Sequence, residues 1–201
     1  MSDDFRIEGA IGATAGGLFL VLGHLLNYIG TQPTGTTAGK SLVFAGHVVL
    51  VFAFIGLHAH QRRYGRALVG RIGMVLSTVG TVLVSAIVFV ELAGTSGVDT
   101  TPVFEAAGAS VLYTVGPLVF VLGMLSVGAS ILKRHDLPRV TGGLLILGTV
   151  VFAGASVIAD FAALLTVAGA VLTAAGFIRL GIALYTQSAS RTDSGNPSSD
   201  D

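Results

Sequence analysis

Six apolar stretches, each close to the length of a bilayer crossing, fill most of this 201-residue sequence. A helix needs about 20 mainly apolar residues to cross the hydrocarbon core of a membrane. Lipid offers the backbone no hydrogen-bond partners, so a stretch of this length crosses it as a helix. The sequence therefore predicts an all-α, polytopic transmembrane helical bundle with six spans. The expected spans are residues 11–29, 41–57, 68–92, 106–132, 140–159 and 161–185.

The last two stretches are separated only by Asp160, so they could form one block from residue 140 to residue 185. Such a block is more than twice as long as one crossing requires. We therefore expect a tight hairpin of two helices here, and not a single long helix.

The composition excludes several function classes. Only 11% of the residues are charged, whereas soluble domains carry about 25%. The net charge is zero, and no run of Lys or Arg is interleaved with aromatic residues, so nucleic acid is not an expected partner. The absence of cysteine excludes disulfides, thiolate metal sites and thiol catalysis. The lipid bilayer is the expected partner, and a second membrane protein or another copy of the chain stays open.

The basic residues lie on one side of the predicted membrane. They gather in the second and fourth connections between spans, and only Lys40 falls on the other side. Because Lys and Arg are enriched in cytoplasmic loops, both termini are expected in the cytoplasm of a multi-pass protein of the cell membrane. These residues would fix the topology and contact anionic lipid headgroups. They are Arg62, Arg63, Arg66, Arg71, Lys133, Arg134 and Arg139.

The C-terminal end differs in composition from the rest of the chain. Residues 187–201 are rich in Ser, Asp, Gly, Asn and Pro, and Ala189 is their one apolar residue. A segment that cannot bury apolar surface does not fold by itself. We expect one six-helix transmembrane domain over residues 1–186 and a disordered cytoplasmic tail over residues 187–201.

Polar residues within the spans indicate a candidate site. His24 and Asn27 lie three residues apart in the first span, and Gly17 continues the face that they share. Small residues on a membrane helix favour contact with another helix, so this face is expected to point into the bundle. His47 in the second span is expected at nearly the same depth as His24. With Glu91 of the third span, these residues form a candidate polar site in the outer half of the bilayer.

Two more carboxylates are expected on the outer side. Glu105 begins the fourth span, and Asp160 lies between the last two. Both also occupy positions where the N-terminus of a helix favours a negative charge, so capping is the alternative to a chemical role. Pro117 interrupts the fourth span and is expected to remove one backbone hydrogen bond there.

Three functions are compatible with this pattern. The first is a small transporter or proton-coupled carrier that uses the candidate polar site. The second is a non-catalytic membrane subunit or scaffold that docks a partner through its Gly-rich helix faces. The third is a b-type haem or metal protein ligated by His24 and His47. An enzyme is the least expected, because the spans contain no nucleophile–base pair at a recognisable spacing, and no phosphate-binding loop, HExxH or GxSxG motif is present.

Overall fold

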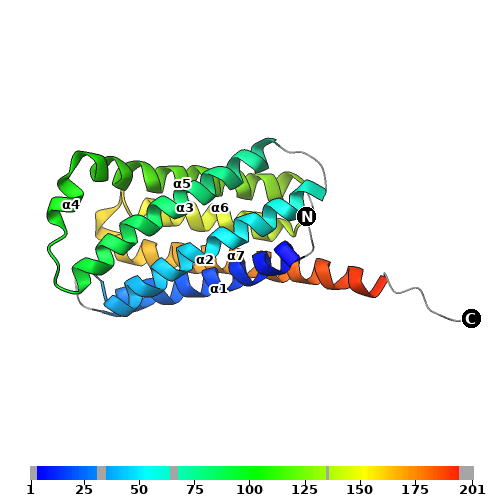
Figure 1. Cartoon of the computed structure of the whole chain (residues 1–201), viewed down its shortest axis with the longest axis horizontal. Coiled ribbons are helices and arrows are strands. Elements are labelled where there is room, and N and C mark those ends of the chain that lie inside the picture. The colour runs from blue at the N-terminus through cyan, green and yellow to red at the C-terminus, as the bar shows by residue number, and fades with distance from the viewer. Residues whose placement is uncertain (1–3, 31–34, 64–67, 135, 195–201) are drawn as a thin grey trace, which may run out of the picture.

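The structure is a computed structural model that describes residues 4–30, 35–63, 68–134 and 136–194. Within these ranges the regular secondary structure is entirely helical (Figure 1). The prediction of an all-helical bundle is therefore confirmed. The long helices are α1 (Asp4–Ile29), α2 (Thr37–Arg63), α3 (Leu68–Thr95), α5 (Ala107–Arg134), α6 (Arg139–Gly154) and α7 (Ala162–Ser194). A short helix α4 (Thr101–Glu105) precedes α5, and a 3-10 turn η1 (Ala159–Phe161) precedes α7.

Five helices of the described ranges are long and apolar enough to cross a membrane, namely α1, α2, α3, α5 and α7. The chain is therefore an apolar helical protein suited to a multi-pass position in a bilayer. The remaining long helix, α6, is apolar but has only 16 residues. At 1.5 Å per residue it is about 24 Å long, somewhat shorter than a typical hydrocarbon core.

The long helices form a closed ring. Each one packs against its neighbours in the order α1, α2, α3, α5, α6 and α7, and α7 packs back against α1. Figure 1 shows both termini at one end of the bundle and α4 at the other. The end that carries the termini is called the basic end below, because the α2–α3 and α5–α6 connections lie there. The other end is called the α4 end.

The interior of the ring is apolar at mid-length. Leu50 and Phe54 of α2 are fully buried, as are Leu145 of α6 and Phe177 of α7. The rings of Phe54 and Phe177 meet edge to face, with their centroids 5.9 Å apart. A layer of large apolar side chains thus separates the two ends of the bundle.

Glycines bring the helices of the ring into close contact. A Cβ added to Gly9 of α1 would lie 2.5 Å from the Cα of Gly56 in α2, and one added to Gly80 of α3 would collide with the backbone of Phe120 in α5. Small residues allow such close approach between membrane helices. Most Gly-rich faces therefore pack against other helices of the same chain, whereas open space surrounds Gly108 and Gly143.

Three local features add detail to the sequence-based expectation. The α4 helix occupies part of the connection after the third span and includes Pro102 near its start. Pro117 lies inside α5, which continues as one helix through it. Helix α7 runs on to Ser194, beyond residue 187, because extending an existing helix costs far less than starting one. The last part of the expected tail, residues 195–201, lies outside the described residues.

Candidate functional site

Glu91 at the α4 end is part of an ion pair. The Lys40 Nζ of α2 lies 2.5 Å from the Glu91 Oε2 of α3, and the two side chains are 19% and 28% exposed. Lys40, the one basic residue expected on the outer side, thus neutralises the carboxylate that the sequence assigned to the polar site. The pair connects α2 to α3 near the surface of the bundle.

Asn27 holds the connection between α1 and α2. Its Oδ1 accepts a hydrogen bond from the backbone N–H of Thr36, with an N–O distance of 2.9 Å. The same oxygen lies directly over Gly39, where there is no room for a Cβ. The amide therefore closes a turn, which is a structural use of this side chain.

His24 and His47 each pack against a different phenylalanine. The His24 ring meets Phe152 of α6 edge to face at 5.1 Å between centroids. The His47 ring lies 5.9 Å from the ring of Phe120 in α5, and its Nδ1 is 2.8 Å from the carbonyl oxygen of Val43. His47 is 6% exposed, so its ring is buried in the bundle.

The two histidines also differ in depth. Along the α1–α2 contact, Gly23 meets Val43 and Leu20 meets Gly46. This register sets His47 level with the residue before Leu20, about 7.5 Å along the axis from His24 at 1.5 Å per residue. Among the described residues, no group of three or more His, Asp or Glu side chains could hold a metal ion.

The two additional carboxylates lie outside the bundle. Glu105 is the last residue of α4, and Asp160 lies in η1 before α7; both are exposed. Neither converges on the histidines. The residues predicted for the outer polar site thus take part in an ion pair, a hydrogen bond to Thr36, two aromatic contacts and two exposed positions. Three of them are also linked electrostatically, His24 with His47 and His47 with Glu91.

A buried polar cluster occupies the basic end instead. Its members come from α1, α2, α5, the α5–α6 connection and α7, which are far apart in the sequence. Arg6 and His60 are 1% and 0% exposed, and Gln61 is 4% exposed. We call this group the basic-end cluster; it consists of Arg6, His60, Gln61, Ser130, Arg134, Asp136 and Gln187.

Asp136 lies at the centre of the basic-end cluster. Its Oδ2 is 3.4 Å from Arg134 Nε and 3.8 Å from His60 Nε2, and its side chain is 3% exposed. Its backbone carbonyl accepts a hydrogen bond from Gln187 Nε2 at 3.2 Å. Arg134 also donates to the Gln61 carbonyl oxygen at 3.4 Å. Asp136 therefore connects α2 and α5 through its carboxylate, and α7 through its backbone carbonyl.

Several polar atoms of this cluster have spare hydrogen-bonding capacity. Four of its buried atoms have no hydrogen-bond partner among the described residues, namely Gln61 Nε2, Ser130 Oγ, Asp136 Oδ1 and Gln187 Oε1. A buried polar atom without a partner costs free energy, and a site with several of them can hold water or a polar ligand. Gly70 of α3 lies against both Gln61 and Ser130, so a side chain is absent where they meet.

The sequence contained one signal for this cluster. Arg6 lies four residues before Ala10 and eleven before Gly17, so it continues the small-residue face of the first span. That face points inward, and Arg6 is buried with it. Arg134 was expected to contact lipid, because spacing along the sequence does not show that the basic end closes over it and His60.

The other basic residues remain at the surface. Arg62, Arg71, Lys133 and Arg139 are exposed, as expected of residues that face headgroups or water. The side chain of Arg63 and the whole of Arg66 lie outside the described residues.

The sequence matches no protein-family model, no curated protein and no solved structure. Function is therefore inferred from the chain's own residues.

Proposed function

We propose that this chain is a six-span protein of the cell membrane with both termini in the cytoplasm. We further propose that it is a small proton-coupled carrier, with the basic-end cluster as its polar binding site. The observation that carries the proposal is the convergence of four ionisable side chains, Arg6, His60, Arg134 and Asp136, inside one end of an apolar bundle. Such residues are costly within membrane helices and commonly mark ion or substrate pathways.

The closed ring of six long helices supports the proposal that the chain crosses the membrane six times. Helix α6 begins at the basic end and packs along α7, which returns to that end. An even number of crossings also leaves both termini on the side of the two basic connections, in line with the distribution of Lys and Arg. Helix α6 is shorter than a typical hydrocarbon core, and local thinning of the bilayer can accommodate a short helix.

The topology can be tested with single cysteines, because the native chain contains none. A membrane-impermeant maleimide added to intact cells is expected to label Ser96→Cys in the α3–α4 connection. Lys133→Cys and Thr186→Cys are expected to react only after the cells are permeabilised. Labelling of Thr186→Cys but not Lys133→Cys in intact cells would mean that α6 does not cross. Labelling of both would mean that the whole orientation is reversed.

The arrangement of layers fits a carrier. The basic-end cluster lies on one side of the apolar layer that contains Phe54 and Phe177, and His47 lies on the other. A polar solute on either side would meet this layer as a barrier, so its passage would require the helices to rearrange. His60 and Asp136 supply groups that can bind and release a proton during such a cycle.

A hydrated cluster predicts selective reactivity of a buried cysteine. Ser130→Cys changes one atom at a side chain that is 2% exposed and belongs to the cluster. We expect a small charged thiosulfonate, added to inside-out vesicles, to modify it at least tenfold faster than Ser77→Cys. Ser77 is 0% exposed and lies in the α3–α5 contact, outside the cluster, so it controls for burial. Mass spectrometry of the intact protein would measure both rates.

Equal, slow modification of both cysteines would indicate a dry cluster and would contradict a binding site there. If Ser130→Cys reacts, pH-gradient-driven uptake of labelled amino acids, sugars and small anions into proteoliposomes would identify the solute. The Asp136→Asn variant should lose such uptake while it keeps the wild-type elution profile. Uptake that persists in this variant would assign the transported solute to another site.

A further inference from the structure

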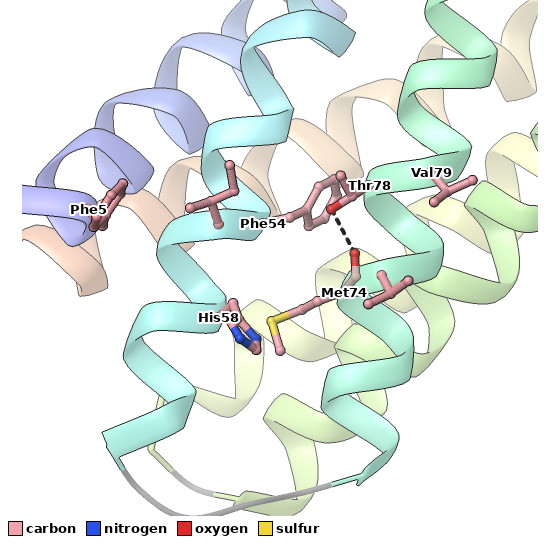
Figure 2. Close-up of a pocket in the computed structure, with 8 residues that line it drawn as sticks. Phe5, Phe54, His58, Met74, Thr78 and Val79 are labelled. Carbon is pink, nitrogen blue, oxygen red and sulfur yellow. Dashed lines mark hydrogen bonds between the residues drawn. The ribbon is translucent and has the colours of Figure 1, made fainter. Parts of the chain in front are cut away.

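A groove on the outer surface of the bundle lies between α2 and α3, next to the start of α1. It encloses about 370 Å³. Figure 2 shows Phe54 and His58 from α2, Met74 and Val79 from α3, and Phe5 from α1 around it. Val75 and Val79 are 62% and 47% exposed, so the groove opens outward. In a membrane this face meets lipid.

The walls of the groove are almost entirely apolar. Its one hydroxyl, from Thr78, already donates to the carbonyl oxygen of Met74 at 2.8 Å, as the dashed line in Figure 2 shows. Ile55 and Val75 line the same space with aliphatic side chains. The groove therefore offers an occupant apolar contact and no hydrogen-bonding group except the ring of His58.

Positive charge lies at the basic end of this groove. Arg62 follows His58 by four residues on α2, and Arg71 precedes Val75 by four on α3, so each lies on the helix face that lines the groove. Both guanidinium groups are exposed, and both act electrostatically on the His58 ring. An apolar channel that ends in a positive rim complements a molecule with a hydrocarbon chain and an anionic head.

We propose that this groove binds an anionic phospholipid of the leaflet at the basic end, with an acyl chain along Ile55 and Val75 and the phosphate near His58 and Arg71. The proposal is independent of the carrier function. It goes beyond a general attraction of basic loops to headgroups, because it assigns one groove, one lipid class and the residues that hold each part.

The test measures lipid retention by native mass spectrometry of the full chain, after addition of phosphatidylglycerol or phosphatidylcholine to the delipidated protein. We expect the wild type to bind phosphatidylglycerol more tightly. Arg71→Gln should lower that affinity about fivefold, which corresponds to about 1 kcal/mol for one basic residue at an anionic surface. Val75→Trp should fill the groove and abolish the preference for phosphatidylglycerol over phosphatidylcholine.

Two control variants separate the groove from general effects. Lys133→Gln removes an exposed cation from the basic end away from the groove, and Val82→Trp enlarges another outward residue of α3 that is 54% exposed. Both should bind phosphatidylglycerol like the wild type, and thermal unfolding in detergent would confirm that all variants are folded. Equal affinity for the two lipids, equal losses in Lys133→Gln and Arg71→Gln, or full binding by a folded Val75→Trp would each overturn the proposal.

Discussion

Replacement of Asp136 by alanine is expected to destabilise the folded bundle by about 3–5 kcal/mol, the usual cost of removing one partner from a buried ion pair. The substitution leaves Arg134 and His60 in a buried site without the carboxylate that lies 3.4 and 3.8 Å from them. Equilibrium unfolding in mixed micelles, followed by circular dichroism, would measure the loss. The Arg134→Ala/Asp136→Ala double variant should be less destabilised than the sum of the two single variants, because it removes the unpaired charge.

Asp99 provides the matched control for the loss of a carboxylate. It lies in the connection before α4, is fully exposed, and accepts a hydrogen bond from the backbone N–H of Thr101 at 3.0 Å. The Thr101 hydroxyl and that backbone bond lower the pKa of Asp99, so it is charged at neutral pH. Asp99→Ala should leave the unfolding transition almost unchanged. If both variants unfold alike, the buried cluster does not hold the basic end together.

Glycine-to-alanine substitutions are expected to have opposite effects at two helical positions. In Gly80→Ala the new Cβ would collide with the backbone of Phe120, which cannot move without shifting α5. We expect a loss of about 1–3 kcal/mol, the range typical of overpacking. In Gly143→Ala the Cβ meets nothing within 4 Å, so the higher helix propensity of alanine should stabilise the chain by up to about 1 kcal/mol.

The same unfolding assay measures this pair, and each substitution is the control for the other. Both add one methyl group to a helix, so any general effect of alanine cancels in the comparison. Stabilisation by Gly80→Ala would show that α3 and α5 do not approach each other as closely as the structure has them.

The helices were predictable from the sequence because a single apolar stretch in lipid satisfies its backbone hydrogen bonds by forming a helix. The hairpin around Asp160 followed from length alone. The ends were less predictable: α7 extends to Ser194, and α4 forms within a connection. Neighbouring helices of the ring pack closely at glycines, and hydropathy does not show which helix each glycine meets.

The candidate site was harder to predict, because polar residues can be used in several ways. Glu91 is neutralised by Lys40, a partner 51 positions away, and Asn27 closes a turn. Spacing along one helix shows which residues share a face, and Arg6 on its small-residue stripe was detectable in that way. It does not show which residues of other helices meet that face, so Asp136 and Gln187 became cluster members only through the fold.

The contact between the first and last helices has a consequence for biogenesis. Gly17 of α1 packs against Ala174 and Phe177 of α7, and Gly181 of α7 packs against Thr14 of α1. When α1 enters the membrane during synthesis, this face has no partner until the ribosome has made α7. A nascent chain that stalls before α7 would therefore expose the small-residue face of α1 in the bilayer. Quality-control proteases could recognise this unpaired face.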